Sequence, residues 1–290
     1  MKTPDRRQIL GLASSALVIG ANHAHSHEAR APRRVHLRKS LKFGMVAVEG
    51  DLKTKFMAAL DAGFEGIEMD SPNGFDPDEV LAAKEATGIE IPGVVDSVHW
   101  RKTLGDPDAN VRAEGVTGLE TALRDCNIYG GTTALLVPAV VNAGISYEDA
   151  YERSLTEIRK VLPLAEELGI KIAIENVWNN FLLSPLEAAR YVDALGEHVG
   201  WYMDIGNVVK YGWPAHWIRT LGKRILKLDI KDYSRKTSWA PIGDGDSDWP
   251  EVMRALEDVG YEGWASAEVG GGGAERLREI SDRMDRVFRL

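Results

Sequence analysis

The sequence predicts a single-domain (β/α)8 TIM barrel, and two observations lead to that prediction. First, short apolar runs alternate with stretches of helical periodicity eight times from Leu41 onward. Second, 44% of the 290 residues are hydrophobic, which is enough to bury one full core. The competing fold, an open doubly wound sheet, is expected to carry a glycine-rich phosphate loop after its first strand, and AVEGDLKTK (47–55) does not supply one.

Each predicted strand is a short apolar run, and each predicted helix has apolar residues at helical spacing. The longest helical stretch, 146–169, has Ser146 placed to cap its start and Gly169 placed to end it. Other helices are expected at 52–63, at 77–88 and, as an amphipathic segment, at 274–290. The strands are expected at LKFGMVAV (41–48), GIEMD (66–70), IEIPGVVDSV (89–98), TTALLVPAV (132–140), IKIAIEN (170–176), VGWYMDIGN (199–207), ILKLDIKDY (225–233) and GWASAEV (263–269).

The first 31 residues differ in character from the rest and are typical of a secretory leader. Arg6 and Arg7 precede an apolar run at 9–21 that is too short to span a bilayer comfortably, and DRRQIL resembles a twin-arginine signal. Cleavage is expected after Ala24 or at 29–31, and a disordered basic tail is the alternative. We therefore expect an exported, periplasmic protein with no stable membrane anchor after cleavage. Its predicted organisation is a signal peptide and leader (1–31), a linker (32–40) and the barrel (41–290).

Charge and cysteine content narrow the classes of function. The formal net charge of −9 disfavours nucleic acid, because a phosphate backbone calls for a basic face. Cys126 is the single cysteine, so neither an internal disulfide nor a cysteine-ligated metal is expected. Its amphipathic surroundings favour a role as a small core residue. A small polar molecule remains the expected partner.

Charged and apolar side chains alternate in the seventh predicted strand, within RILKLDIKDYSR (224–235). In a closed barrel, one face of each strand packs on the helices and the other faces the interior. Strands five, six and eight show the same alternation and predict the same two faces. For strand seven, the predicted faces are Leu226, Leu228 and Ile230 toward the helices, and Lys227, Asp229 and Lys231 toward the interior.

Strands five to eight each end with an inward acid, and active sites of this fold lie at the C-terminal ends of the strands. Four buried like charges cannot all stay ionised without a counter-charge. A divalent cation would supply it, and an all-oxygen cage suits Mn²⁺ or Mg²⁺ better than Zn²⁺. Capping of the following helices is the alternative role for individual acids. The predicted metal ligands are Glu175, Asp204, Asp229 and Glu268, with Lys231 adding positive charge beside them.

These segments resemble the xylose isomerase-like TIM barrels, the sugar isomerase and epimerase superfamily that includes the D-tagatose 3-epimerase-like enzymes. The resemblance covers most of the chain from Leu41 onward. It rests on the glutamate of IAIEN, the aspartate of MDIGN, the KDY segment, the glycines of IGDGDSDW and the glutamate of SAEV. It implies a small sugar as the partner and a metal held by Glu, Asp, His and Glu, which correspond by position to the four acids above. Dimers and tetramers are common in similar proteins, so a homo-oligomer is one expected assembly.

Two positions depart from the family pattern. Asp229 stands where the family usually has histidine, two residues before the lysine of its H-x-K-D stretch, so a hard cation should be preferred still more. Asn207 stands where the family often has histidine, and asparagine can only hydrogen-bond. Both differences bear on the substrate and the reaction. Arg235 matches a family arginine that holds substrate hydroxyls or the metal-site glutamate.

Several further side chains are candidates for contacting substrate. His99 lies at the end of the predicted third strand, with a structural role as the alternative. Glu68 faces inward on the second strand, and Trp178 could stack on a sugar ring or pack in the core. For His216, a packing or surface role is the favoured interpretation. The full substrate-binding set is His99, Asn207, Lys231, Arg235, Glu68, Trp178 and His216.

The acids and the resemblance together predict a divalent-metal-dependent sugar isomerase or epimerase that acts through a metal-bound enediolate. Glu175 and Glu268 come from strands that are not adjacent, and paired glutamates of the resembling epimerases move the proton on opposite faces, so these two are the expected catalytic pair. A 3-keto-glycoside lyase or hydrolase at the same metal site is one alternative, favoured by the expected export. A non-catalytic periplasmic sugar-binding protein is the alternative of another class.

Overall fold

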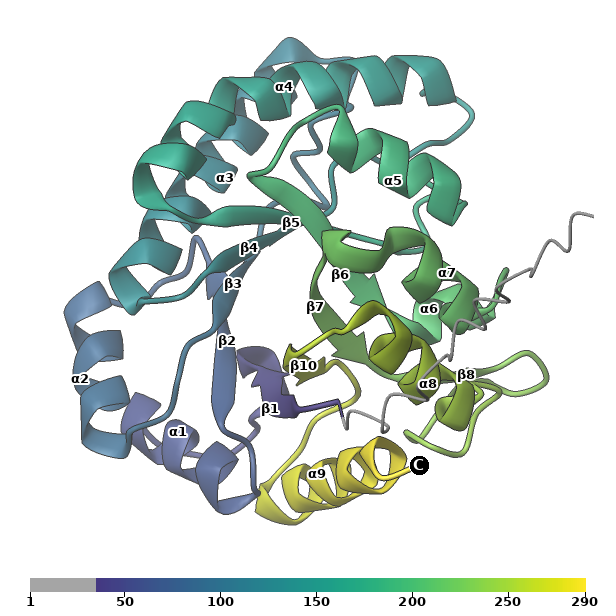
Figure 1. The fold of residues 1–290 in the computed structure, drawn as a ribbon. Coiled ribbons are helices and arrows are strands. Elements are labelled where there is room, and N and C mark those ends of the chain that lie inside the picture. The colour runs from purple at the N-terminus through teal and green to yellow at the C-terminus, as the bar shows by residue number, and fades with distance from the viewer. Residues whose placement is uncertain (1–34) are drawn as a thin grey trace, which may run out of the picture. The chain divides into compact units, whose positions relative to one another are not determined.

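Eight parallel strands close into a barrel in the computed structural model, which describes residues 35–290 (Figure 1). The strands follow one another around the barrel in chain order, and the last one pairs with the first. This arrangement confirms the predicted (β/α)8 fold. The barrel strands are β1 (Leu37–Lys42), β2 (Gly66–Ser71), β3 (Gly93–Asp96), β4 (Thr133–Leu136), β5 (Lys171–Glu175), β6 (Val199–Asp204), β7 (Ile225–Ile230) and β10 (Gly263–Ala267).

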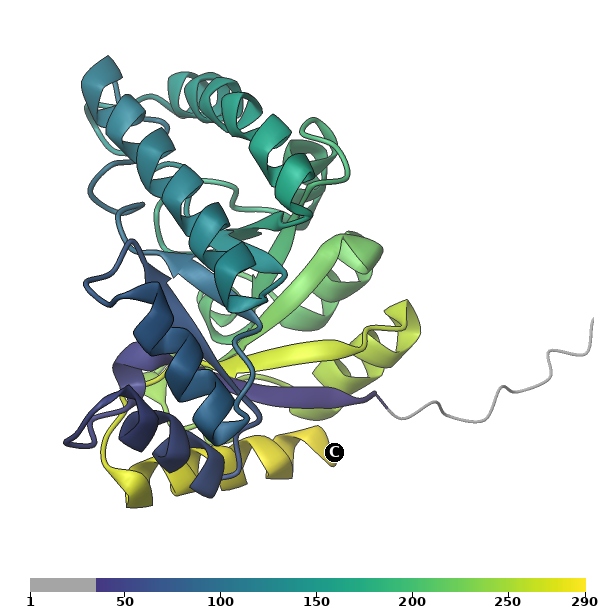
Figure 2. The same cartoon turned by 90° about the vertical axis from the view of Figure 1, so that its left-hand side faces the viewer.

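The α-helices lie outside the strands and cover the barrel wall (Figure 1, Figure 2). The longest helix is capped by Ser146, whose hydroxyl accepts a hydrogen bond from the N–H of Asp149 at 3.1 Å. It ends at Gly169, whose φ of 68° is left-handed, so both predicted ends are confirmed. The helices are α1 (Leu52–Asp61), α2 (Pro77–Thr87), α3 (Ala109–Tyr129), α4 (Tyr147–Leu168), α5 (Pro185–Asp193), α6 (Ile205–Val209), α7 (Pro214–Leu221), α8 (Trp249–Val259) and α9 (Ala274–Phe288).

The first barrel strand begins earlier than predicted. Strand β1 is LRKSLK, and the predicted strand 41–48 instead contains a 3₁₀ turn at Phe43–Met45 and one isolated bridge from Val46. The cause is that four of its six residues, Arg38, Lys39, Ser40 and Lys42, are charged or polar, so β1 has no apolar run to mark it. Residues 37–40, which were predicted as linker, therefore belong to the barrel, and Lys42 lies at the C-terminal end of β1.

A bulge in β7 places one side chain on the face opposite to the expected one. The register of β7 against β6 shifts between Trp201 and Tyr202, so that Leu226 is an extra residue in β7. Leu226 packs against the small apolar cluster inside the barrel, which includes Tyr202. The prediction that Leu226 faces the helices is wrong. Leu228 and Ile230 lie in the main core between strands and helices, as predicted.

The chain after β7 turns back on itself instead of prolonging the barrel strand. Strand β8 (Asp232–Ser234) pairs antiparallel with β9 (Ser238–Ala240), and the two form a separate hairpin. The predicted strand 225–233 was too long, because barrel pairing stops at Ile230 and Asp232 already belongs to the hairpin.

One buried carboxylate organises the loop that follows this hairpin. One oxygen of Asp232 accepts hydrogen bonds from the backbone N–H groups of Gly243 (3.0 Å) and Gly245 (3.1 Å), and from the indole N–H of Trp249 (2.9 Å). Gly245 is required at its position, because a Cβ there would lie 2.2 Å from Asp232 Oδ1. Trp249 is 3% exposed and belongs to the core. The IGDGDSDW segment is therefore held as a unit by Asp232.

Packing explains the single cysteine. Cys126 on α3 is buried in the main core, and burial raises the pKa of its thiol to about 12. The thiol is therefore protonated at neutral pH, which agrees with the predicted core role.

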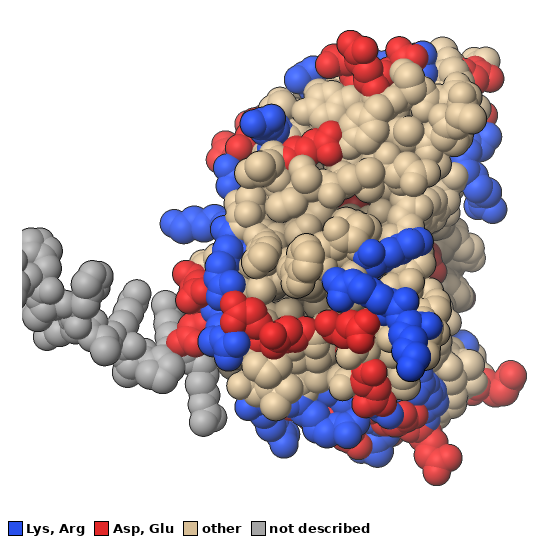
Figure 3. All heavy atoms as spheres, turned by 90° about the vertical axis from the view of Figure 1, so that its right-hand side faces the viewer, with Lys and Arg blue, Asp and Glu red and all other residues tan. Residues whose placement is uncertain are grey.

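The distribution of surface charge and the search for membrane-spanning helices concern the predicted partners and the predicted location. Acidic and basic side chains are interspersed on the face that carries α7, α8 and β8 (Figure 3). No helix within residues 35–290 combines the length and apolar character needed to cross a membrane. The predicted signal peptide and leader lie outside the described residues, so they stay predictions.

Candidate active site

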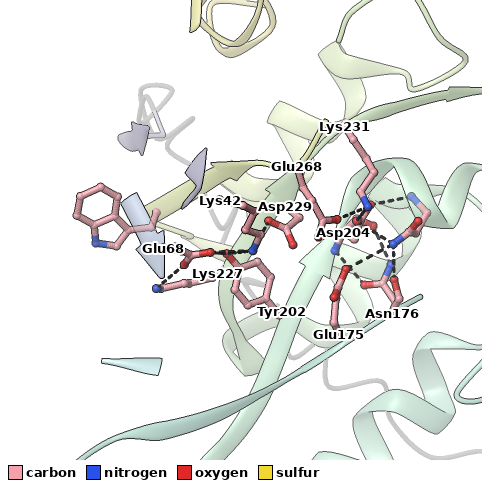
Figure 4. A network of polar contacts seen from close by, with 12 residues as sticks. Lys42, Glu68, Glu175, Asn176, Tyr202, Asp204, Lys227, Asp229, Lys231 and Glu268 are labelled. Atoms are coloured by element: carbon pink, nitrogen blue, oxygen red, sulfur yellow. Dashed lines mark hydrogen bonds and ion pairs between the residues drawn. The ribbon is translucent and has the colours of Figure 1, made fainter. Parts of the chain in front are cut away.

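Four carboxylates meet at the C-terminal end of the barrel, as the sequence predicts. Glu175 and Asp204 end β5 and β6, Asp229 lies one residue before the end of β7, and Glu268 follows β10 directly. One oxygen atom from each residue lies within 4.8 Å of the corresponding atoms of the other three. Figure 4 shows the side chains converging from these four strands.

Burial and mutual repulsion disturb the ionisation of this cluster. Burial, followed by the charges of Glu268 and Asp229, raises the pKa of Glu175 well above its usual range. Burial likewise raises the pKa of Asp229 well above its usual range, and that of Asp204 to about 6. Negative charge in the cluster therefore exceeds what its surroundings compensate, and a bound divalent cation would relieve the excess.

Lys231 compensates one side of the cluster. Its Nζ forms an ion pair with Asp204 Oδ2 at 2.8 Å and another with the carboxylate of Glu268. Although burial opposes it, the charge of Lys231 holds the pKa of Glu268 below its usual range. Gly206, the glycine of MDIGN, makes this approach possible, because a Cβ there would lie 2.5 Å from Lys231 Cγ.

The other side of the cluster contains the residue that replaces the family histidine. Asp229 is fully buried, and within residues 35–290 neither of its oxygens receives a hydrogen bond. Lys42 Nζ lies 2.9 Å from Asp229 Oδ1, as an ion pair that lacks hydrogen-bond geometry. Buried acceptors without donors are costly, and all four side chains offer carboxylate oxygens, so the residues present fit a hard divalent cation such as Mn²⁺ or Mg²⁺.

Two asparagines position Asp204. The backbone N–H of Asn207 donates to Asp204 Oδ1 at 2.7 Å, and its side-chain amide donates to Oδ2 at 2.8 Å. The backbone N–H of Asp204 donates to the side chain of Asn176 at 3.0 Å. Where the family often has histidine, Asn207 is therefore fixed by hydrogen bonds to the acid cluster.

The cluster opens into a cavity of about 820 Å³ at the same end of the barrel. Its wall combines acids, amides and aromatic rings, which is typical of sites that bind small polar molecules. The predicted substrate-binding residues that line it are His99, Trp178, Asn207 and Lys231, together with the predicted catalytic residues Glu175 and Glu268.

His99 lines this cavity as a neutral imidazole. Its Nδ1 accepts a hydrogen bond from the backbone N–H of Val137 at 3.1 Å. Burial lowers the pKa of His99 to about 3, so the ring is neutral at physiological pH and carries its proton on Nε2. His99 can therefore donate a hydrogen bond from Nε2, but it cannot serve as a general base there.

Three residues predicted to bind substrate do not line the cavity. Glu68 is 1% exposed inside the barrel, where Lys227 and Lys42 bind its two oxygens at 2.8 and 2.7 Å. His216 is exposed on α7, beside Trp213. Arg235 is exposed in the hairpin turn, where its guanidinium donates to the carbonyl of Gly212 at 3.0 Å. These positions do not support a substrate-binding role, and Glu68 is instead part of a buried ion network.

Lys42 is the most important site residue that the sequence reasoning missed. It joins the acid cluster to the buried ion network, since the same Nζ contacts Asp229 and Glu68. Its inward position would have been visible had β1 been placed at 37–42. Asp70, Asn73 and Ser97 also line the cavity from the ends of β2 and β3. Their short polar segments, such as SPNG, predict only an ordinary turn and do not indicate a role in a binding site.

Comparisons with known proteins agree with this fold. A model of the family described as xylose isomerase-like TIM barrel matches residues 56–287. D-psicose 3-epimerase of Ruminiclostridium cellulolyticum is 25% identical over 230 residues, which cover 74% of this chain and 77% of that protein.

Two solved structures show the same fold. The structure of 3-keto-D-glucoside 4-epimerase, YcjR, from E. coli matches with a TM-score of 0.74 at 16% identity, over 88% of this chain and 100% of that one. The structure of the IOLI protein with a binding zinc atom matches with a TM-score of 0.74 at 17% identity, over 87% of this chain and 98% of that one.

Proposed function

Because this chain belongs to the xylose isomerase-like TIM barrel family, we propose that it is a divalent-metal-dependent sugar isomerase or epimerase. The observation that carries the proposal is the convergence of four buried carboxylates beside a polar cavity. The similarity to D-psicose 3-epimerase supports an enzyme of the isomerase class. The substrate is a sugar with a carbonyl group next to a C–H group that can lose its proton.

Glu175, Asp204, Asp229 and Glu268 would hold the cation. We favour Mn²⁺ or Mg²⁺, because the donor set is entirely carboxylate, and Zn²⁺ is the competing metal, since the IOLI protein was solved with zinc. When bound, the cation would polarise the sugar carbonyl and acidify the neighbouring C–H group.

Glu175 and Glu268 are proposed to move the proton. Lys231 keeps the pKa of Glu268 low, while burial and neighbouring acids raise that of Glu175. Two carboxyl groups whose pKa values are pushed apart suit a base that removes a proton and an acid that returns one. They stand on β5 and after β10, which do not pair with each other, so they can approach the sugar from different sides.

The remaining cavity residues are proposed to orient the sugar. His99 would donate from Nε2 to a sugar oxygen, and Lys231 would contact a hydroxyl beside Glu268. Trp178 would contact the sugar with its ring edge, because Trp239 and Lys210 Nζ lie over its ring, and its indole N–H is held by the carbonyl of Asn207 at 3.0 Å.

Proton exchange tests the proposal. Candidate keto-sugars are incubated in D₂O with the Mn²⁺-loaded protein, and carbon-bound deuterium is followed by NMR. Glu175→Gln is expected to lower the exchange rate at least a hundredfold, because it removes a proton-transfer group. Glu167→Gln, on the exposed surface of α4, is the matched control and should exchange like the wild type. Absence of exchange with every keto-sugar tested would reject the proposal.

The alternatives predict different readouts in the same experiment. Release of the substituent from a 3-keto-glycoside would identify a lyase or hydrolase at this site. Sugar-induced thermal stabilisation without exchange would identify a binding protein. The molar mass from light scattering tests whether the protein forms the proposed homo-oligomer. Export by a twin-arginine signal at residues 1–31 is a further proposal, tested by N-terminal sequencing of the protein recovered from a periplasmic fraction.

A further inference from the structure

A second cavity adjoins the first one. It has a volume of about 500 Å³ and lies between the β8–β9 hairpin, the loop after it and α9. Lys231 and Glu268 line both cavities, so a molecule held at the carboxylate cluster could extend into the second space. None of the activity proposed above requires this second space.

An aromatic pair connects the two cavities. Trp239 lines the second cavity and is 49% exposed, while Trp178 lines the first. Their rings are stacked, with centroids 4.5 Å apart and planes 11° from parallel. Tyr233 packs edge-on against both rings, at 5.2 and 5.4 Å. Trp178 thus supports one face of the half-exposed Trp239, and Lys231 Nζ lies 5.2 Å from the centre of the Trp239 ring. A ring supported in this way suits stacking with a flat apolar face of a ligand.

Part of the wall of the second cavity is apolar. Ile242 and Ile280, both nearly fully buried, belong to it. Ile242 begins the segment that the buried carboxylate of Asp232 ties down. The cavity is therefore present without a ligand, and its lining combines these buried apolar side chains with the ring of Trp239.

The charges around the second cavity are balanced. Arg276 donates to the carboxylate of Glu279 at 2.8 Å, and Arg283 binds both Glu279 (2.9 Å) and Asp244 (2.8 Å). Lys231 is matched by the acid cluster. The cationic side chains that line this space thus already have anionic partners, which disfavours a phosphate group there and suits a neutral one.

Packing explains two glycines of the run before α9, Gly271 and Gly272. Phosphate groups often bind in barrels of this kind near the loops after the last two strands. Here, however, a Cβ at Gly271 would lie 2.0 Å from the carbonyl oxygen of Met45, and Gly272 donates to that oxygen at 3.0 Å. These glycines therefore serve a close backbone approach.

We infer that the second cavity is a subsite for a neutral ring attached to the reacting sugar, so that the substrate class is keto-glycosides in preference to free or phosphorylated keto-sugars. This inference rests on the proposed function, since it places the reacting sugar at the carboxylate cluster. The attached ring stacks on Trp239, and the link between the two rings passes Lys231 and Glu268.

The experiment compares two substrates that differ in the attached group. Deuterium exchange into a methyl 3-keto-β-glucoside is compared with exchange into a 3-keto-glucoside whose attached group is a second glucose. The wild-type protein is expected to have a kcat/KM roughly threefold to tenfold higher for the two-ring substrate, the gain that one aromatic contact typically supplies. Fructose 6-phosphate should exchange more slowly than either glycoside.

Variants test where this preference arises. Trp239→Ala removes the stacking face, and Ala240→Phe fills the cavity from β9; both should lower the ratio of the two kcat/KM values toward one. Trp213→Ala is the matched control, since this tryptophan is 64% exposed and lines neither cavity. Circular dichroism checks that each variant is folded. Equal kcat/KM values in the wild type, or a ratio that neither cavity variant changes, would overturn the subsite.

A binding measurement separates this inference from the proposed function. Saturation-transfer NMR with methyl β-cellobioside needs no turnover. Signal transfer to the ring that carries the methyl group, which corresponds to the attached ring, would support the subsite even if no keto-sugar exchanged its proton, provided that Trp239→Ala weakens the transfer. Absence of transfer to that ring would overturn the subsite, while proton exchange in the first cavity would still stand.

Discussion

Two neighbouring groups of buried charged side chains lie inside this barrel, and they differ in their balance of positive and negative charge. In the inner group, Glu68 is bound by Lys42 and Lys227, with Tyr202 donating a further hydrogen bond at 2.7 Å. In the outer group, four carboxylates share Lys231 and one contact from Lys42. Figure 4 shows both groups in one view. Cations are in excess in the inner group, and acids are in excess in the outer one.

This difference in charge balance distinguishes a structural ion network from a candidate site, even between two residues of one strand. Lys227 and Asp229 are two residues apart on β7 and face the same interior, yet one completes a neutralised ion pair and the other adds to an unneutralised cluster. Buried charge by itself therefore does not indicate a site. Buried charge of one sign that its neighbours do not compensate does indicate one.

Breaking the inner group should have the largest effect on stability. Glu68→Gln leaves two buried lysines without their shared carboxylate, so the free energy of unfolding should fall by about 3–5 kcal/mol. Urea denaturation followed by circular dichroism measures the change. Glu166→Gln on α4 is the exposed control and should change it by less than about 0.5 kcal/mol. A loss below about 1 kcal/mol for Glu68→Gln would mean that the inner group is not a structural ion network.

Filling the outer group should stabilise the protein. At a Mn²⁺ concentration of 100 times Kd, the free energy of unfolding should rise by about 2.7 kcal/mol, and EDTA should reverse the change. Asp229→Asn removes one carboxylate and should abolish most of this metal-dependent gain. Thermal unfolding with and without Mn²⁺ measures it. An equal gain in wild type and variant would show that Asp229 does not hold the cation.

The outer group should also make the metal-free protein less stable as the pH rises. Asp204 has a folded-state pKa of about 6, above the value of about 3.9 in an unfolded chain. Between these values the folded protein holds a proton that the unfolded chain releases, so a stabilising contribution on the order of 2 kcal/mol is lost as pH rises from about 4 to 6.

A variant isolates this contribution from that of His99. The lowered pKa of His99 produces a slope of opposite sign, because stability is lost as the pH falls from about 6.5 toward 3. Asp204→Asn keeps the His99 slope and removes the acid. The stability difference, wild type minus variant, should therefore decrease from pH 4 to pH 6 in urea titrations with EDTA. A difference that stays constant or increases would contradict the raised pKa of Asp204.

The smallest effect concerns Lys42, which touches both groups. Its Nζ lies 2.9 Å from Asp229, so its positive charge should repel a cation bound by that residue. Lys42→Met should lower the stability of the metal-free protein, yet increase the gain on adding Mn²⁺ by an amount on the order of 1 kcal/mol. Calorimetric titration with Mn²⁺ measures the affinity directly. Weaker binding in the variant would show that Lys42 positions Asp229 more than it opposes the metal.

The fold and the four acids were predictable because they depend on local pattern. Alternation along a strand decides which side chains face inward, and the fold places strand ends together, so Glu175 and Asp204 required no knowledge of distant partners. The polar strand β1 and the bulge at Leu226 escaped prediction, because the pairing of neighbouring strands decides both. The position of Glu68 deep in the barrel depends on lysines from two other strands.

The second cavity was beyond the reach of the sequence for the same reason. KDY reads as the continuation of strand seven, and nothing local indicates that barrel pairing stops at Ile230 and that the chain turns back after Ser234. The stacking of Trp178 on Trp239 joins the loop after β5 to strand β9, sixty-one positions further along the chain. Trp178 was visible as a candidate for stacking, but its pairing with Trp239 was not.

The pairing of β1 with β10 has a consequence for the order of events during synthesis. Leu37 to Leu41 pair with Gly263 to Ala267, so the barrel can close only after its last strand has left the ribosome. Until then β1 lacks the partner that fixes Lys42 beside Glu68 and Asp229. A growing chain therefore carries these acids with an incomplete counter-charge, and contacts between chain ends of this kind form late. The barrel therefore closes and its interior acids gain the charge of Lys42 at the same stage of folding.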